Sequence, residues 1–512
     1  MVMNPLANAR LPLGLSWSLV GILIGLYALV VTAAADHPQE RPVYVTNAAS
    51  CDISTFLVDV VTGRPTLVGY PVKAGQGVRN MAITPDARYT YAGNSGDSTI
   101  SAYSVGAQGI LTPLFTVVSG GATPVGGVIS PNGCTLYFAH VFEEVASGGS
   151  IAAFRIASNG SLQTLGPPIV ATAPHPRGLV ITPDGRFLYA GHGDPGAERR
   201  NTSVGAITSY AVHDDGTLTP IGSPIHAGRF CGDATVTPDG GRLYVLCQDF
   251  DQIFGFAIGH DGGLAPLPGS PYVVAGEFPE GIASSPDGHF VFVASPGRVS
   301  NGSVSAFSVR ADGSLTEVPG SPYPGGFGPV GIAPLPNGKF VYASTDVDSS
   351  PADRGALDAF AVRPFDGSLR PLPGSPFADG GHGPGYSSFS VLPNQGPLAH
   401  FRFAARSQAE EEGEDEEGDG RSDQLSLRFD ASDSVDPDGL VAHYTWDFGD
   451  GVIVDTVEHQ TTHVYARAGR FTVTLTVTDN EGCSTTLVSI GRAVLCAGTT
   501  AATTSRIVTV GG

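Results

Sequence analysis

Hydrophobic and polar residues alternate in short stretches along most of the chain, as in residues 205–212, 303–309 and 356–362. Alternation with a period of two, carried by β-branched and aromatic residues, predicts β-strands with one buried face. A run of small residues (178–181) and a bulkier run (186–190) precede the first of these stretches, and the same order returns later in the chain. The pattern therefore predicts a protein built mainly from short strands.

A turn phrase groups these strands into units. In its clearest copies it reads Ser or Thr, Pro, Asp and Gly, a combination in which Pro presets the first corner and Gly takes the positive φ. Its prolines are 46 to 57 residues apart. They are Pro85, Pro131, Pro183, Pro238, Pro286, Pro336 and Pro393. A repeat of this length, with four strands in each unit, indicates a propeller or a solenoid.

The two ends of the repeat region complement each other. The first unit begins at its second strand (42–47), and the last phrase (386–393) is a first strand with no others after it. The last strand is therefore expected to complete the blade that the first strand starts, which closes a ring and protects the sheet edges. We predict a seven-bladed β-propeller over residues 41–396. Its small-residue strands should lie innermost, where strands crowd around the axis.

The N-terminal segment indicates export. Arg10 is the only charged residue before Asp36, and an apolar stretch runs from residue 11 to 35. Ala33 and Ala35 fit the small-residue positions of a signal-peptidase site, so residues 1–35 are interpreted as a signal peptide. The stretch is also long enough to span a bilayer as an uncleaved anchor, which would be the chain's link to a membrane. Either alternative places the protein outside the cytoplasm, secreted or at the cell surface.

Charge and cysteine content agree with this location. A formal net charge of −21 argues against nucleic-acid binding, which needs a basic face. Six cysteines are consistent with an oxidising compartment, although all six could be reduced and buried. Two disulfides are predicted: Cys483 with Cys496, and Cys231 with Cys247. The second needs a small bulge, because a simple four-residue turn would place Cys231 nearer Gln248. Cys51 and Cys134 have no evident partner.

The repeat region resembles a known family. Its Tyr-Val-Thr-Asn segment at 44–47 and its repeated Ser/Thr-Pro-Asp-Gly turns resemble the YVTN-type propellers. Among these it is most similar to the lactonase family, the relatives of 6-phosphogluconolactonase. Gly-Ser-Pro segments at 222–224, 269–271, 320–322 and 374–376 also fit that family. The resemblance implies a reaction centre at one mouth of the central channel that uses His, Arg and Glu side chains.

Several polar residues stand where the innermost strands begin. Opening a lactone needs a general base for water and a cation or donors for the developing oxyanion. The candidate catalytic residues are His175, Arg177, Asp233 and Glu280, and the candidate ligand-binding residues are Arg79 and His382. The family's Gly-Pro-Arg-His segment is missing, however, and residues 230–233 occupy a comparable place. The alternative is that these residues line a wet channel and satisfy one another.

The residues after the propeller follow another pattern. Segments 429–439, 444–451, 463–465 and 472–479 closely resemble the motifs of the polycystic-kidney-disease (PKD) domain, an immunoglobulin-like β-sandwich. The resemblance implies a PKD domain over residues 397–512, with Trp446 as the core anchor between two sheets. An acidic run is interpreted as a solvated insertion at 407–421.

Four aspartates of this domain suggest a cation site. Asp436, Asp438, Asp447 and Asp450 offer the oxygen ligands that Ca²⁺ prefers. Alternatively, these side chains cap turns by accepting hydrogen bonds from backbone N–H groups. No cofactor is expected other than Ca²⁺ in the first of these interpretations.

Two functions of different classes follow. The first is a secreted or cell-surface binding module for an extracellular glycan, cell-wall or protein ligand, with the PKD domain as a spacer. The second is a secreted lactone hydrolase, a carboxylic-ester hydrolase that acts at the channel mouth. A purely structural envelope protein is a third. Because sugar phosphates are largely cytoplasmic, an exported lactonase is not expected to serve the pentose-phosphate route.

Overall fold

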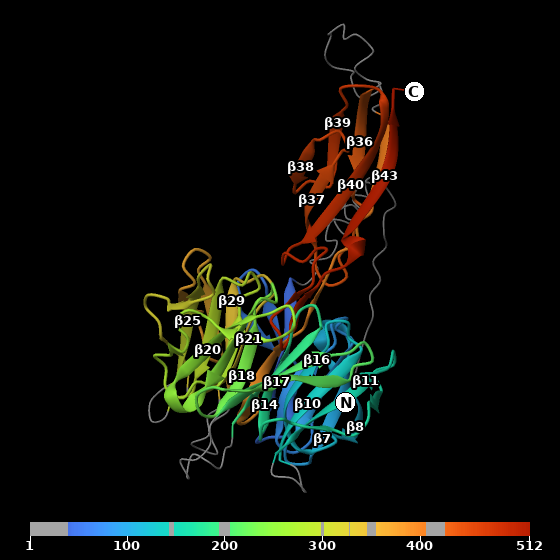
Figure 1. Cartoon of the computed structure of the whole chain (residues 1–512). Helices are drawn as coiled ribbons and strands as arrows, with labels where there is room; N and C mark the ends of the chain where they lie inside the picture. The colour runs from blue at the N-terminus through green and yellow to red at the C-terminus, as the bar shows by residue number, and fades with distance from the viewer. Residues whose placement is uncertain are drawn as a thin grey trace, which may run out of the picture. The chain divides into compact units, whose positions relative to one another are not determined.

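The computed structural model describes residues 39–142, 148–193, 205–297, 302–326, 328–345, 355–405 and 425–511 (Figure 1). The expected signal peptide (1–35) and the acidic insertion (407–421) lie outside the described residues. Within the described stretches, no helix is long and apolar enough to cross a membrane. The fold is all-β, with short 3-10 turns at η1 (Ala107–Gly109), η3 (Gln248–Phe250) and η6 (Thr500–Ala502).

Seven antiparallel sheets of four main strands each form the propeller, and each sheet runs from an innermost to an outermost strand. The innermost strands are β5 (Val78–Ile83), β9 (Ala122–Ile129), β14 (Pro176–Ile181), β18 (Cys231–Val236), β23 (Gly281–Ser284), β28 (Pro329–Pro334) and β33 (Pro384–Val391). The second strands are β1 (Glu40–Asn47), β6 (Tyr89–Asn94), β10 (Thr135–Phe142), β15 (Phe187–His192), β19 (Arg242–Cys247), β24 (Phe290–Ser295) and β29 (Phe340–Thr345).

The outer half of each blade completes the sheets. The third strands are β2 (Asp52–Asp59), β7 (Thr99–Val105), β11 (Ser150–Ile156), β16 (Ala206–Val212), β20 (Gln252–Ile258), β25 (Ser303–Val309) and β30 (Ala356–Val362). The fourth are β3 (Pro65–Leu67), β8 (Leu111–Val118), β12 (Leu162–Thr164), β17 (Leu218–His226), β21 (Leu264–Pro266), β26 (Leu315–Glu317) and β31 (Leu369–Pro371). Five blades add a two-residue strand: β4 (Val72–Lys73), β13 (Ile169–Val170), β22 (Tyr272–Val273), β27 (Tyr323–Pro324) or β32 (Phe377–Ala378).

The ring closes as the sequence predicts. Strand β33 pairs with β1, placing Val391 opposite Val43 and Phe389 opposite Val45. The innermost strands contact one another in the cyclic order β5, β9, β14, β18, β23, β28, β33 and back to β5. The small-residue strands are therefore innermost.

The repeated turn phrase owes its composition to a local network. Thr182 donates its hydroxyl to Asp184 Oδ1, and the same oxygen accepts the backbone N–H of Arg186 at 3.1 Å. The Thr182 hydroxyl oxygen in turn accepts the N–H of Phe187. Each phrase thus joins the innermost and second strands of its blade.

Tyrosines of the second strands tie neighbouring blades together. Each hydroxyl donates to the carbonyl of the glycine that turns the third strand into the fourth in the next blade, at 2.6 to 3.1 Å. The pairs are Tyr44–Gly109, Tyr91–Gly160, Tyr137–Gly216, Tyr189–Gly262, Tyr244–Gly313 and Tyr342–Gly63. The last pair joins the final blade to the first. In the remaining blade the second strand, β24, has Phe292 at the position of these tyrosines. The corresponding glycine of the next blade is Gly367.

Replacing Phe292 with Tyr is expected to raise the free energy of unfolding by about 1 kcal/mol, the net value of a hydrogen bond formed at a place already shaped for it. The glycines at the two seams are alike, because the Phe290 ring lies against Gly367 as the Phe340 ring lies against Gly63. Thermal unfolding of the variant measures the effect. The reverse substitution, Tyr342→Phe, should cost a similar amount, and a Phe292→Tyr variant that unfolds at lower temperature would contradict the expectation.

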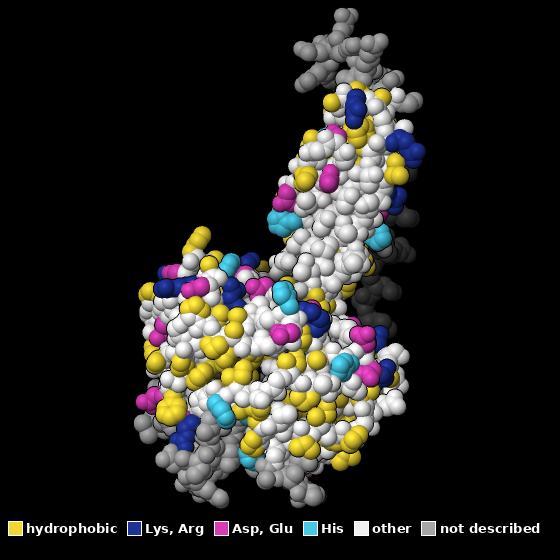
Figure 2. Space-filling view, in the orientation of Figure 1, with side chains coloured by type: hydrophobic (Ala, Val, Ile, Leu, Met, Phe, Trp, Pro, Cys, Tyr) yellow, Lys and Arg dark blue, Asp and Glu magenta, His cyan; other side chains and the backbone are white. Residues whose placement is uncertain are grey.

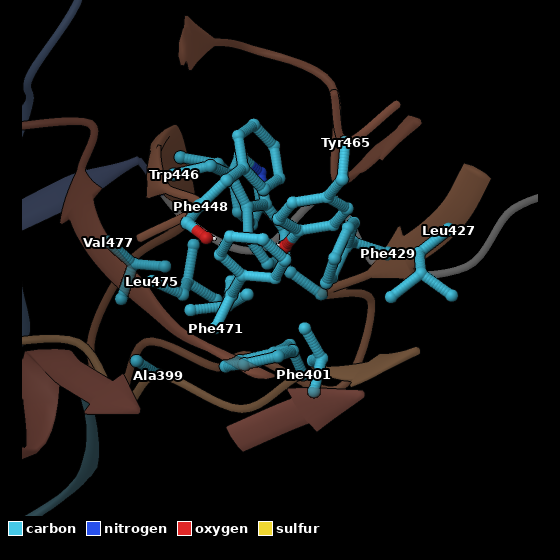
Figure 3. Close-up of a cluster of buried hydrophobic side chains, with 14 of the residues drawn as sticks. Ala399, Phe401, Leu427, Phe429, Trp446, Phe448, Tyr465, Phe471, Leu475 and Val477 are labelled. Carbon is cyan, nitrogen blue, oxygen red and sulfur yellow. Dashed lines mark hydrogen bonds between the residues drawn. The ribbon is translucent and has the colours of Figure 1, made fainter. Parts of the chain in front are cut away.

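The C-terminal domain is a two-sheet sandwich, as expected from its resemblance to PKD domains, and Figure 3 shows the buried side chains of its core. One sheet contains β35 (Arg402–Ala405), β36 (Ser426–Asp430) and β39 (Gln460–Val464). The other contains β38 (Ile453–Thr456), β37 (Val441–Asp447), β40 (Gly469–Asp479) and β43 (Thr503–Val510). Trp446 is fully buried between them and packs on Phe401 and Phe429 at centroid distances of 5.2 and 5.6 Å. It is the predicted core anchor.

A small third sheet contains β34 (Asn394–Gln395), β42 (Val494–Ala497) and β41 (Val488–Ser489). The disulfide Cys483–Cys496 closes the segment that carries β41 and the start of β42. The second expected disulfide joins Cys231 to Cys247 on facing positions of β18 and β19, and the pairing register shifts between Cys231 and Ala234. The anticipated bulge is therefore present. Cys51 and Cys134 carry free thiols.

Candidate functional site

One backbone feature recurs where each innermost strand begins. The residue at this position has a positive φ of 54° to 64° in all seven blades, and Pro follows it in five. These residues, which we call the mouth ring, are Gly77, Thr123, His175, Phe230, Phe278, Gly328 and Gly383. Since every blade repeats the same strand order, the ring lies at one end of the channel, which we call the mouth.

The mouth ring has two unlike halves. The four non-glycine members belong to the consecutive strands β9, β14, β18 and β23, and the three glycines belong to β28, β33 and β5. A left-handed φ is unfavourable for a side chain, above all for β-branched Thr123, and costs of order 1–3 kcal/mol at each residue. Such strain persists mainly at functional sites. The half that carries Thr123, His175, Phe230 and Phe278 is therefore the candidate site.

Three predicted residues each follow a member of the mouth ring by two positions in the sequence, so all three lie at the same level of the channel, just inside the mouth. Arg79 is half-buried and donates from Nε to Ser95 Oγ at 3.1 Å. Arg177 is nearly buried, with its guanidinium carbon 4.3 Å from the centroid of the Phe230 ring. This is a cation–π arrangement. Glu280 is half-buried, and its backbone N–H donates to Ala294 O.

The two predicted histidines differ. His175 belongs to the mouth ring, and its Nδ1 lies 2.8 Å from Val141 O. His382 is exposed one residue before the ring member Gly383, and its backbone N–H donates to Ser50 Oγ. The structure therefore places His175, Arg79, Arg177 and Glu280 around the mouth and leaves His382 on its outer rim.

Asp233 has a different setting from the one that a catalytic base would need. It is buried one residue deeper than Arg177, and its Oδ2 forms an ion pair with Arg492 Nη1 at 2.7 Å. The same oxygen accepts the N–H of Ile282 from the next blade at 3.2 Å. Burial raises the pKa of the Asp233 carboxyl, and the Arg492 guanidinium opposes that rise.

The repeat explains this setting. Asn80 stands at the equivalent position, five residues before its turn proline, and its Oδ1 accepts the N–H of Gly127 from the next blade at 2.9 Å. Both side chains therefore make the same link between blades. Asp233 differs by its negative charge, which Arg492 balances.

Sequence reasoning missed Phe230, Phe278 and Arg492. The two phenylalanines had a detectable signal, because Phe230 directly precedes an innermost strand, as His175 does, and Phe278 lies three residues before one. Arg492 had none, since it lies 259 residues from Asp233 and in another domain.

The four candidate calcium ligands fall into two groups, Asp447 with Asp450 and Asp436 with Asp438. Asp447 Oδ1 accepts Gly449 N–H, and Asp450 accepts Val452 N–H while its Oδ2 lies 2.8 Å from His463 Nε2. These contacts are turn caps. Asp438 forms an ion pair with Arg41. Burial, with the nearby Asp438 and Asp479, raises the pKa of Asp436 to about 7. In the part of the chain that the structure describes, no three His, Cys, Asp or Glu side chains are arranged to hold a metal.

The surface charge is dispersed on the face drawn in Figure 2. Lys and Arg side chains stand singly among Asp and Glu there, and no basic patch gathers on that face.

Two family profiles match the chain. The profile described as "Lactonase, 7-bladed beta-propeller" matches residues 42–178 and 167–276, and that of the PKD domain matches residues 413–494. A short match, 46% identical over 56 residues, links the chain to the collagenase ColA of Clostridium perfringens. It covers 11% of this chain and only 5% of the collagenase.

Solved structures share the propeller. A candidate 6-phosphogluconolactonase from Bacteroides uniformis has a TM-score of 0.57 and 20% identity, over 69% of this chain and 100% of that one. The periplasmic gluconolactonase of Pseudomonas aeruginosa has a TM-score of 0.53 and 21% identity, over 69% and 99%. At this identity the likeness establishes the fold and not the activity.

Proposed function

Because the chain joins a lactonase-type seven-bladed β-propeller to a PKD domain, we propose that it is an exported binding protein whose propeller mouth takes a glycan. The observation that carries this proposal is the asymmetric mouth ring. Its side-chain half contains half-buried Phe278 and His175, and half-buried Glu280 lies two residues beyond Phe278. Aromatic faces stack on sugar rings, and charged side chains exchange hydrogen bonds with several hydroxyls.

Two observations support export. Both disulfides, Cys231–Cys247 and Cys483–Cys496, suit an oxidising compartment. The similar gluconolactonase from Pseudomonas aeruginosa is periplasmic, so a propeller of this shape works outside the cytoplasm. The PKD domain would then act as a spacer, and a protein or cell-wall polymer is an alternative ligand.

Lactone hydrolysis is the second candidate. It is favoured by the position of Glu280, which shares its depth in the channel with Arg79 and Arg177. Glu280 would serve as the general base for water, and the guanidinium groups would stabilise the oxyanion. Against it stands Asp233, since its ion pair with Arg492 engages one of the expected carboxylates in a structural contact.

The full chain should be measured against immobilised cell-wall polysaccharides and soluble glycans, and in parallel against a panel of aldonolactones. Phe278→Ala and Glu280→Gln are each expected to weaken glycan binding about tenfold or more, a loss of roughly 1.4 kcal/mol. Matched controls are Phe365→Ala and Glu458→Gln, because both side chains are exposed away from the mouth. Their binding should stay unchanged.

Each outcome separates the two candidates. Lactone turnover that disappears in Glu280→Gln and persists in Glu458→Gln would replace the binding proposal with the hydrolase. Absence of binding to every polysaccharide, or equal loss in the mouth variants and their controls, would refute a glycan site at the mouth.

A further inference from the structure

The disulfide-closed segment of the PKD domain touches the innermost strands of the propeller. The carbonyl of Ile490 accepts the backbone N–H of Val236 at 3.1 Å and the hydroxyl of Thr235 at 3.0 Å. The carbonyl of the next residue, Gly491, accepts the N–H of Ile181 at 2.9 Å. Two neighbouring blades, through β18 and β14, therefore hold the same short stretch of backbone.

Arg492 extends these contacts across the channel. Its Nη1 pairs with Asp233 of β18, and its Nη2 donates to the carbonyl of Ile332 on β28. Strand β23 lies between β18 and β28 in the ring. A single guanidinium can bridge blades that are not neighbours only if it lies inside the lumen that they surround.

Apolar residues on either side of Arg492 fill the remaining space. Ile490 and Leu495 are fully buried and belong to one core cluster with Ala283 and Ile332 of the innermost strands. Residues 492–495 also face β5, β28 and β33 across a cavity of about 20 Å³. A space of that size holds about one water molecule, so the lumen is filled at this depth.

The segment enters from the end opposite the mouth. Ile181 and Val236 are the last residues of their strands, whereas the mouth ring stands where the strands begin. Gly491 makes the approach feasible, because a Cβ there would lie about 3.0 Å from the Val236 backbone nitrogen and its φ is +87°.

We propose that residues 484–495 are a built-in plug that seals this end of the propeller channel, so that ligands reach the channel through the mouth alone. The plug is seated by two elements. The Cys483–Cys496 bond holds the segment as a closed loop, and the Arg492–Asp233 pair gives a buried carboxylate its counterion. The sealed end is independent of the glycan proposal, and its test needs no ligand.

Hydrogen exchange of the full chain, read by mass spectrometry, tests the plug. The amides of Ile181 and Val236 donate to plug carbonyls, so their exchange reports whether the plug is seated. Arg492→Glu places like charges together at Asp233 and is expected to speed exchange of both amides at least tenfold. Cys483→Ser combined with Cys496→Ser is expected to act in the same direction.

Internal controls separate plug release from unfolding. The amides of Val212 and Ile258 in the outer strands, and those of β40 in the PKD core, should keep their wild-type exchange rates. Arg467→Glu makes the same charge change at an exposed position of the PKD domain and should alter nothing. If Arg492→Glu does not fold, Arg492→Gln removes the counterion of Asp233 without adding a negative charge, and exchange of the Ile181 and Val236 amides is again expected to be faster than in the wild type.

Two results would overturn the plug. One is exchange of Ile181 and Val236 in the wild-type chain at the rate of unprotected amides. The other is unchanged protection of both amides in Arg492→Glu and in the double serine variant. Neither the ion pair nor the disulfide would then hold the plug in the channel.

Discussion

Replacing Arg41 with Met is expected to lower the free energy of unfolding by about 3–5 kcal/mol, the range for removing one member of a buried ion pair. Arg41 is 1% exposed, in β1. Its guanidinium bonds to Glu481 and Asp438 of the PKD domain and to Asn394 Oδ1 at 2.8 Å. Removing it leaves the buried carboxylate of Glu481 and the part-buried carboxylate of Asp438 without their cation.

The charge of Arg41 is secure in the native protein. Burial by itself lowers the pKa of its guanidinium, but the carboxylates of Glu481 and Asp438 more than offset this and hold the pKa above its ordinary value. Chemical denaturation of the wild type and the variant measures the loss. Arg310→Met is a matched control, since Arg310 is exposed and its replacement should cost less than about 1 kcal/mol. Equal stability of Arg41→Met and wild type would contradict the buried network.

The loss in Arg41→Met should depend on pH. Burial raises the pKa of Asp479 to about 6, and burial with neighbouring carboxylates raises that of Asp436 to about 7. Both carboxyls therefore bind protons more tightly in the native state than in the unfolded chain. Their protonation stabilises the native state at low pH, and this contribution is lost as the pH rises from about 4 to 7. The Arg41 guanidinium opposes the rise in the pKa of Asp436, so without Arg41 this carboxyl depends more on a bound proton for neutralisation. The deficit should be larger at pH 8 than at pH 5, by roughly 1 kcal/mol.

Replacing Gly126 with Ala is expected to destabilise the propeller by about 3 kcal/mol, because the added methyl group would clash with backbone. Gly126 lies in β9, and a Cβ there would be far inside van der Waals contact of the Arg177 carbonyl oxygen on β14. The clash is with a neighbouring innermost strand, so relief would require the blades to move apart.

Thermal unfolding of Gly126→Ala measures this effect. Gly148→Ala is the control, since a Cβ at Gly148 meets no atom within 4 Å and its φ is not left-handed. The control should unfold close to the wild type. An unchanged midpoint for Gly126→Ala would mean that the innermost strands pack less closely than the structure shows.

Local chemistry explains why so much of the fold was predictable. The turn phrase forms its own hydrogen bonds, such as that of Thr182 with Asp184, so its residues predict the turn without contacts from the rest of the molecule. Counting the phrase predicted the blades, and the unmatched strands 42–47 and 386–393 predicted the pairing of β1 with β33. The offset of Cys231 from Cys247 anticipated the bulge in β18.

The candidate site was predictable only in part. The position of His175, Arg177 and Glu280 near the start of innermost strands follows from the repeat, since every blade places that start at the same end. The backbone strain of the mouth ring could not be predicted from the repeat, because Thr123 and Phe278 are not residues that favour a positive φ. Their positive φ is a feature of the folded chain that their residue types do not indicate.

The sequence by itself determined the seven blades and their closure, because these depend on patterns that repeat over a few residues, and its resemblance to PKD motifs predicted the sandwich around Trp446. Only the tertiary structure decided what Asp233 and Arg41 do. Each is held by a partner more than 250 residues away, Arg492 and Glu481 respectively. A buried charge needs a counterion, and the residue that supplies it is brought close only by folding. The local sequence around Asp233 or Arg41 therefore does not indicate which residue that will be.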